Sequence, residues 1–157
     1  MNTKKYKKLK ICLAASAGGH LTQLLKLAKT WDEYDPFFIT TCEAVKNKLE
    51  QYGNVYITAE SNREHPLKVL KVLFYCLRII LKERPDVVIS TGAAIGCVAC
   101  ILGKLIGAKV IWIDSITNVE KLSLSGRLVR PISNLFLAQW QQFAKQYPNV
   151  FFEGTII

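Results

Sequence analysis

Acidic residues are few in this sequence: 12 Asp and Glu residues stand against 21 Lys and Arg residues, which gives a formal net charge of +9. This surplus predicts a negatively charged partner, such as a phosphorylated substrate, an anionic lipid surface or nucleic acid. Nucleic acid is the least favoured of these, because the sequence has no known nucleic-acid-binding motif and its aromatic residues do not alternate with basic ones. We therefore expect no nucleic-acid partner.

Several motifs that mark common α/β enzymes are also missing. The sequence contains neither the Gly-x-Gly-x-x-Gly fingerprint of dinucleotide-binding domains nor a P-loop, and it has no nucleophile elbow of the Ser-His-Asp type. These absences disfavour a Rossmann-like nucleotide-binding enzyme that acts alone, such as a small dehydrogenase or hydrolase. That class is kept as the alternative function.

The start of the chain and its cysteines both indicate a cytosolic protein. No signal-peptide pattern follows the lysine-rich start. The five cysteines are odd in number and sit inside apolar segments, as buried reduced thiols do. Cys97 and Cys100 have the Cys-x-x-Cys spacing of redox sites, but they lie in an apolar helical pattern, which favours two core thiols.

Apolar runs of strand length alternate with helical patterns along the chain, which is typical of βαβ units and a parallel sheet. We predict strands at 9–14, 37–41, 55–58, 86–90, 110–113, 135–138 and 150–152, and helices at 21–30, 43–51, 66–83 and from the turn at 91–92 to 103. No internal repeat or linker interrupts this pattern. The predicted fold class is α/β: one Rossmann-like domain over residues 1–157, with a mostly parallel sheet and helices on both faces.

Ligands of parallel α/β sheets bind beyond the carboxyl ends of the strands, and the loop Ser16–His20 follows the first strand. Its two glycines would let the backbone approach a ligand, and the next helix would offer free N–H groups to an anion. His20 could donate to a phosphate or act as a base. The alternative is a tight turn with a surface histidine.

Two further loops meet the same condition. Thr91 and Gly92 form a strand-to-helix turn of small residues, for which close helix packing is the alternative. Asp114 and Glu120 belong to the loop after the strand at 110–113, where carboxylates could orient or deprotonate a hydroxyl acceptor. The alternative there is a solvated loop with capping residues.

The predicted helix at 66–83 is mostly apolar, and its basic residues fall on one narrow stripe. This pattern fits a core helix with a basic solvent edge. It fits equally a helix that packs on the sheet and also dips into an anionic membrane surface. The uncharged run within it is too short to span a bilayer.

Four segments together carry a resemblance to a known family: Ser16–His20, Pro85–Gly92, Leu122–Arg127 and Gln139-Trp140. In this order, over nearly the whole chain, they resemble the PssD-type polysaccharide biosynthesis subunits. They are also similar to the membrane-anchoring subunit of the eukaryotic dolichol-linked N-acetylglucosaminyltransferase.

The resemblance implies the N-terminal, acceptor-binding half of a GT-B glycosyltransferase, like the bacterial lipid II N-acetylglucosaminyltransferase. A separate small subunit would bind the UDP-sugar donor, and the pair would act as a hexosyltransferase on a lipid-diphosphate-linked saccharide in capsular or exopolysaccharide biosynthesis. We expect no tightly bound cofactor and no metal ion. The protein would be peripheral, at the cytoplasmic face of an anionic membrane.

Roles for individual residues follow from the resemblance together with the loop chemistry and the helix pattern above. Acceptor and diphosphate binding falls to Ser16, Gly18, Gly19, Thr91 and Gly92, and the catalytic candidates are His20, Asp114 and Glu120. We favour binding for His20 and proton abstraction for the carboxylates, although Asp114 stands where the eukaryotic subunits tend to have Glu. Membrane contact is expected from Lys68, Lys71, Arg78 and Lys82. The apolar segment 151–157 is expected to insert into the partner subunit.

Overall fold

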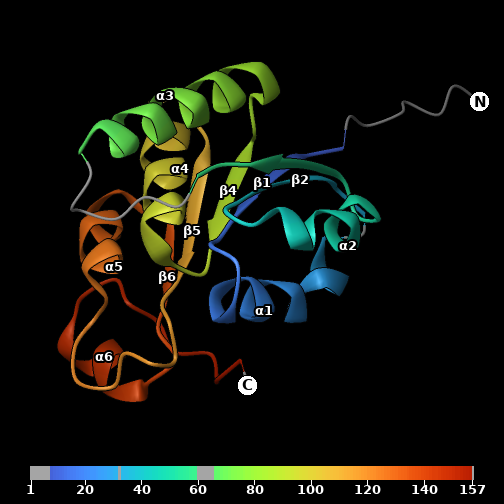
Figure 1. Ribbon diagram of the computed structural model, residues 1–157. Helices are drawn as coiled ribbons and strands as arrows, with labels where there is room; N and C mark the ends of the chain where they lie inside the picture. The colour runs from blue at the N-terminus through green and yellow to red at the C-terminus, as the bar shows by residue number, and fades with distance from the viewer. Residues whose placement is uncertain (1–7, 32, 60–65, 157) are drawn as a thin grey trace, which may run out of the picture.

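The computed structural model describes residues 8–31, 33–59 and 66–156, and one sheet forms its centre (Figure 1). The strands are β1 (Lys10–Ala14), β2 (Asp35–Thr40), β3 (Asn54–Ile57), β4 (Val87–Ser90), β5 (Lys109–Ile113) and β6 (Leu135–Leu137). Their order in the sheet is β3-β2-β1-β4-β5-β6, and every neighbouring pair is parallel. This is the strand order of the Rossmann fold, so the predicted class is confirmed.

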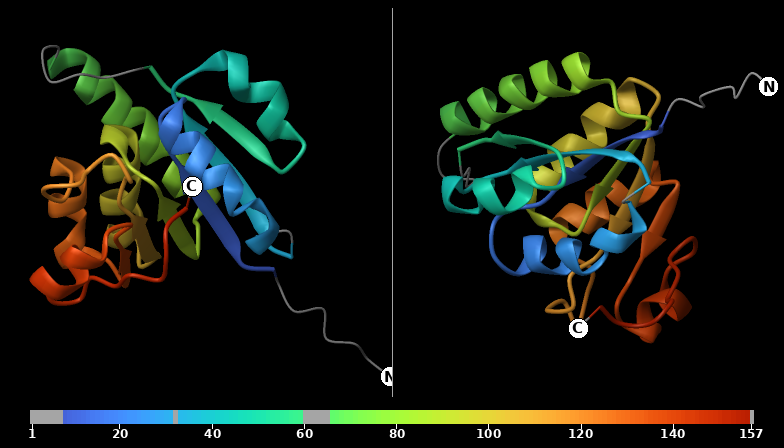
Figure 2. Two further views of the ribbon diagram at one scale, coloured as in Figure 1. Left: turned by 90° about the horizontal axis from the view of Figure 1, so that it is seen from below. Right: turned by 90° about the vertical axis from the view of Figure 1, so that its right-hand side faces the viewer.

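Helices cover both faces of the sheet, as predicted (Figure 2). They are α1 (Gly19–Lys26), α2 (Lys46–Glu50), α3 (Pro66–Glu83), α4 (Ala93–Leu105), α5 (Leu124–Val129) and α6 (Gln141–Gln146), with 3-10 helices at Ala28–Thr30, Glu43–Val45 and Arg130–Ile132. One hydrophobic cluster holds α1 and α2 against one face of the sheet. A second cluster holds α3, α4 and α5 against the other.

Side chains along β1 alternate between these two clusters. Cys12 and Ala14 belong to the cluster with α3 and α4, whereas Ile11 and Leu13 belong to the cluster with α1. Since helices cover both faces of this central strand, both sets of side chains are apolar, which explains the unbroken apolar run in the sequence. Because all strands are parallel, the loops after β1, β4 and β5 leave the sheet at the same edge.

Short elements near the end of the chain differ from the sequence predictions. The helices α5 and α6 were not predicted, because six residues are too few to show a helical repeat of apolar positions. The predicted strand 150–152 is reduced to one bridge, in which Phe151 pairs with Leu137. The Phe151 N–H donates to the Phe136 carbonyl and its carbonyl accepts from the Ala138 N–H, both at 2.9 Å.

Candidate functional site

A cleft of about 460 Å³ opens at the carboxyl edge of the sheet, between α1, the loop after β5 and the C-terminal segment. Its lining residues are Gly19, His20, Thr22, Gln23, Lys26, Ser115, Ile116, Thr117 and Ile156. A larger hollow of about 600 Å³, beside Pro85 and Lys109, lies at the opposite edge. In doubly wound sheets the ligand binds at the carboxyl edge, where the strand order reverses, here between β1 and β4. The first cleft is therefore the candidate site.

The turn before α1 leaves the start of this helix open. Gly18 has a φ of +101°, a left-handed value that glycine adopts without strain. No side chain caps the helix, and its first turn contains no acidic residue. The first helical bond runs from the Thr22 N–H to the Gly18 carbonyl at 2.9 Å. The N–H groups of residues 19–21 therefore remain available to a ligand.

Gly19 has space around it that no described side chain fills. A Cβ built at this position meets nothing within 4 Å, so packing inside the chain does not require a glycine here. The space lies at the positive end of a helix, which favours an anion such as a diphosphate. The predicted diphosphate contact of Gly19 fits this geometry, whereas Gly18 is not among the residues that line the cleft. Ser16, half-buried before the turn, does not line the cleft.

The loop after β4 fixes the ring of His20. Nδ1 of His20 lies 2.9 Å from the Thr91 carbonyl oxygen, and the Thr91 hydroxyl donates to the His20 carbonyl oxygen at 2.6 Å. Gly92 packs against the same ring, since a Cβ built there would lie 2.4 Å from Cε1 of His20. The fold thus brings together residues 71 positions apart in the sequence.

Thr91 and Gly92 are the residues of the second loop that were predicted to bind the acceptor diphosphate. Both residues are buried, and neither lines the cleft. Their polar groups are also occupied: the Thr91 hydroxyl bonds to His20, and the Gly92 N–H donates to the Ser90 hydroxyl at 3.1 Å. In the described part of the chain, His20 links both of these residues to the cleft.

Asp114, which was predicted to orient or deprotonate the acceptor hydroxyl, is held in a network of hydrogen bonds. The side chain is buried, and its Oδ1 accepts from the Ser123 hydroxyl at 2.5 Å and from Trp112 Nε1 at 3.2 Å. Oδ2 accepts from the Ser123 N–H at 3.0 Å. The Ser123 hydroxyl in turn accepts from the Gly126 N–H at 2.8 Å and so caps α5. Asp114 therefore holds the loop between β5 and α5 in place.

Glu120 lies in this same loop with its side chain exposed to solvent. It is not among the residues that line the cleft. The geometry therefore adds nothing to the prediction that Glu120 is catalytic, and His20 is the one predicted catalytic residue that faces the cleft.

Gln23 is a cleft residue that the sequence analysis did not single out. Its side chain is 9% exposed, and its Oε1 has no hydrogen-bond partner among the described residues. A buried acceptor left unpaired costs about 1–3 kcal/mol, which a donor on a bound ligand would offset. One feature of the sequence could have identified Gln23: it is a polar residue next to Leu21 and Leu24, on the buried side of α1. Lys26 adds a positive charge to the same cleft.

The outward side of α3 is apolar to an extent that is unusual for a surface helix. Leu70 and Phe74 are 61% and 62% exposed, and Leu73 and Leu81 are exposed as well. An apolar hollow of about 700 Å³ lies between this part of α3 and the end of β3. None of the helices in the described part of the chain is long and apolar enough to cross a membrane.

Basic side chains flank this apolar surface, although not all those predicted. Lys71 and Arg78 are exposed on α3, while the side chain of Lys68 lies outside the described residues. Lys82, which was also predicted to contact the membrane, is exposed, and its Nζ donates to the Tyr56 hydroxyl at 3.2 Å and lies over the Tyr56 ring. The ammonium group of Lys82 therefore lies against Tyr56 of β3.

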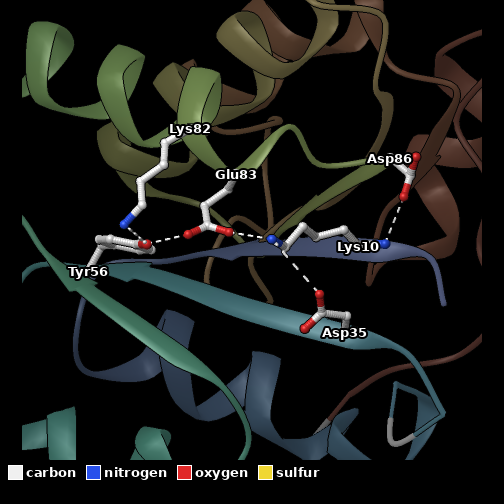
Figure 3. A network of polar contacts seen from close by, with 6 residues as sticks. All are labelled: Lys10, Asp35, Tyr56, Lys82, Glu83 and Asp86. Atoms are coloured by element: carbon white, nitrogen blue, oxygen red, sulfur yellow. Dashed lines mark hydrogen bonds and ion pairs between the residues drawn. The ribbon is translucent and has the colours of Figure 1, made fainter. Parts of the chain in front are cut away.

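Lys82 belongs to a polar network that also includes Lys10, Tyr56 and Glu83 (Figure 3). Glu83 accepts from Lys10 Nζ at 2.5 Å and from the Tyr56 hydroxyl. Burial opposes ionisation of Glu83, but the hydrogen bonds from Lys10 and Tyr56 outweigh it, so the pKa of this carboxyl is lowered. The network ties the end of α3 to β1 and β3.

The Cys-x-x-Cys pair lies in α4, where both thiols are buried. Burial raises the pKa of Cys97, and burial together with the neighbouring Cys97 raises that of Cys100. Redox cysteines need a lowered pKa and access to solvent. The prediction of two core thiols is therefore confirmed.

Comparison with known proteins decides the family. The family model described as "Oligosaccharide biosynthesis protein Alg14 like" matches residues 11–156. The chain belongs to this Alg14-like family. Among curated relatives, the UDP-N-acetylglucosamine transferase subunit ALG14 of Mus musculus is 25% identical and that of Candida albicans is 28% identical. The alignments cover 95% and 99% of this chain, and 83% and 84% of those proteins.

Comparison with solved structures identifies the fold to which the chain is similar. The chain resembles Acinetobacter baumannii MurG with a TM-score of 0.70 at 18% identity, and the UDP-N-acetylglucosamine 2-epimerase of Rickettsia bellii with a TM-score of 0.72 at 14% identity. Each match covers 94% of this chain but only 45% of the solved one. The Alg14-like chain thus has the fold of the N-terminal Rossmann-like domain of a GT-B glycosyltransferase, as predicted, and spans less than half the length of these solved proteins.

Proposed function

We propose that this Alg14-like chain is the acceptor-binding and membrane-recruiting subunit of a two-component, UDP-sugar-dependent glycosyltransferase. The relatives named above are subunits of a UDP-N-acetylglucosamine transferase. The chain corresponds in length to less than half of the solved proteins with this fold. Because those relatives are named as subunits, we take a separate donor-binding subunit to complete the cleft. The product class, a capsular polysaccharide or exopolysaccharide, rests on the resemblance to PssD-type subunits alone.

One observation carries this proposal: the open first turn of α1 lies in the same cleft as the His20 ring. The N–H groups of residues 19–21 would bind the diphosphate of a lipid-linked saccharide, and Lys26 would add charge to the same cleft. His20 would then lie beside the acceptor sugar. The buried Oε1 of Gln23 lacks a hydrogen-bond donor among the described residues, and a hydroxyl group of a bound saccharide would supply one.

The reaction follows from this placement. An acceptor hydroxyl would attack the anomeric carbon of the donor sugar, its oxygen forming the new bond as the bond to the UDP oxygen breaks. The hydroxyl proton would pass to His20, since the carboxylate of Asp114 is buried and already bonded. The negative charge that develops on UDP would be stabilised by the partner subunit.

Membrane recruitment would use the exposed side of α3. Its apolar residues Leu70, Phe74 and Leu81 would enter the headgroup region, and Lys71 and Arg78 would contact anionic lipids. This arrangement supports a peripheral position on a membrane surface, where a lipid-linked acceptor would lie; the cytoplasmic face follows from the resemblance alone.

The proposal is tested by co-expression with a donor-binding subunit, followed by assays of UDP-sugars on membranes. Sugar transfer is expected from the pair and from neither subunit alone. Calorimetry on the isolated chain should give no measurable UDP-sugar binding. Gly19→Ala, which fills the space beside the free N–H groups, should raise the acceptor KM, whereas Asn47→Ala on the exposed side of α2 serves as the control. Micromolar UDP-sugar affinity of the single chain would contradict the proposal.

A further inference from the structure

The hydrogen bond between His20 and Thr91 determines where the proton of the imidazole ring lies. Nδ1 faces the Thr91 carbonyl oxygen at 2.9 Å, and a carbonyl oxygen can only accept. Nδ1 must therefore carry a proton. A neutral imidazole has one N–H, so Nε2 is left with a free lone pair, and among the described residues it has no hydrogen-bond partner.

We infer that Thr91 and Gly92 are positioning residues that hold the neutral His20 ring with its proton on Nδ1 and keep Nε2 as the proton acceptor of the cleft. An unconstrained histidine side chain mostly carries its proton on Nε2, so the fold reverses the ordinary preference. In its neutral form the ring can then accept a proton from a hydroxyl but cannot donate from Nε2 to a phosphate. This assigns proton abstraction to His20 in place of diphosphate binding.

Thr91 acts on both ends of the histidine residue. Its carbonyl accepts from the ring, and its hydroxyl donates to the His20 carbonyl at 2.6 Å, which fixes the backbone from which the ring projects. Thr91 is fully buried, so water does not compete for these bonds. Two hydrogen bonds in opposite directions therefore join the start of α1 to the turn before α4.

Gly92 leaves the space that the ring occupies. A Cβ built at this position would lie 2.4 Å from Cε1 and 2.5 Å from Nδ1 of His20, far closer than non-bonded atoms allow. Its φ of +137° also favours glycine, and Ala93 follows with a φ of +65°. Two successive positive φ values therefore follow Thr91 in this turn, and such backbone geometry is common at functional sites.

The tautomer can be measured directly by ¹⁵N NMR of the full chain labelled at histidine. The sequence has two histidines, so His20→Gln assigns the signals. At a pH where the ring is neutral, we expect Nδ1 of His20 to show the shift of a protonated nitrogen and Nε2 the shift of a bare one. A ring protonated mainly on Nε2 would overturn the inference, whatever the activity of the protein.

Variants separate positioning from general stability. Gly92→Ala should return His20 to the ordinary Nε2–H form, whereas Gly19→Ala, with open space at its Cβ, should keep the Nδ1–H form. If Gly92→Ala does not fold, Thr91→Val and Thr91→Ser replace it: only the serine keeps the hydroxyl that fixes the His20 backbone. An Nδ1–H population equal to wild type in Thr91→Val or in a folded Gly92→Ala would contradict a positioning role.

A kinetic test rests on the proposed function. In the reconstituted pair, Thr91→Val should lower kcat by about tenfold with little change in the acceptor KM, and Thr91→Ser should restore it; a positioned general base contributes about 10²–10⁴-fold in total. A raised KM with unchanged kcat would overturn the base assignment. If the wild-type pair transfers no sugar, the proposed function fails, whereas the tautomer measurement still decides the inference about Thr91 and Gly92.

Discussion

The ammonium of Lys10 lies 2.5 Å from the carboxylate of Glu83, and this ion pair joins the first strand to the end of α3 (Figure 3). The Glu83 side chain is only 6% exposed, whereas that of Lys10 is 27% exposed. Removal of one partner from a buried pair leaves the other charge uncompensated. The pair is therefore important for stability, at the edge of the sheet that the candidate site does not use.

Glu83→Gln should lower the free energy of unfolding by about 2–3 kcal/mol, somewhat less than for a fully buried pair. Chemical unfolding at neutral pH measures this change. Glu43→Gln is the matched control, because Glu43 pairs with Lys46 at 3.2 Å on the surface with a side chain 71% exposed. Such a pair contributes about 0–1 kcal/mol. Equal effects of the two substitutions would contradict the role given to Glu83.

The lowered pKa of Glu83 also predicts a pH dependence. Its hydrogen bonds with Lys10 and Tyr56 stabilise the folded state fully above the ordinary carboxyl pKa of 4.5, and this stability is lost as the pH falls through the lower pKa of the folded state. The difference in stability between wild type and Glu83→Gln should therefore shrink from pH 6 to pH 3. A difference that stays constant over this range would show that the carboxylate charge is not involved.

Gln23→Leu should separate stability from activity. The substitution removes a buried acceptor that lacks a partner, so the isolated chain should become more stable by about 1 kcal/mol or remain unchanged. In the reconstituted pair the same variant should raise the acceptor KM, because a sugar hydroxyl would lose its acceptor. A large loss of stability in thermal unfolding would instead mean that Gln23 is bonded within the folded chain.

Asp114→Asn should lower the stability of the folded chain, and this effect on folding should be its main one. The amide NH₂ would face the donors of Trp112 and Ser123, which costs about 1–3 kcal/mol. The variant should therefore unfold at a lower temperature, whereas Glu120→Gln should leave both unfolding and transfer rate unchanged. A normal melting temperature for Asp114→Asn together with a fall in kcat would restore Asp114 as a catalytic residue.

Much of the fold could be predicted because the central strands are buried on both faces and are therefore continuous apolar runs. The glycine turn at the start of α1 was visible for a similar reason, since its residue types and its place after a strand are local features. By contrast, the bonds of His20 to Thr91 join positions 71 residues apart. No spacing rule predicts which loops meet at the edge of a sheet.

Tertiary contacts explain what the sequence did not show at the remaining positions. Asp114 and Glu120 look alike in the sequence, yet one is bonded to Ser123 and Trp112 and the other is exposed, because the loop folds back onto α5. Lys82 was placed correctly on the basic stripe of α3, but the sequence does not show that Tyr56 of β3 lies beneath it. These outcomes depend on tertiary contacts that local patterns do not contain.

The surface of α3 gives the last prediction, the binding of the full chain to vesicles with anionic lipids. A double variant with Lys71→Gln and Arg78→Gln loses two charges that each contribute about 1 kcal/mol near such a surface, so binding should weaken about 30-fold at low salt. The control variant carries Lys48→Gln and Lys145→Gln, which remove the same charge from exposed positions on α2 and α6. Co-sedimentation with vesicles measures both.

The apolar residues of α3 should contribute in a different way. Leu70→Asn with Phe74→Asn removes two exposed apolar side chains and should weaken binding equally at low and high salt, because burial of apolar groups is not screened. The vesicle binding of the charge variant should approach that of wild type as the salt concentration rises, because screening weakens the attraction between Lys71, Arg78 and the anionic lipids. If the α2 and α6 control loses as much binding as the α3 variant, only the net charge of the protein matters and α3 is not the membrane-binding surface.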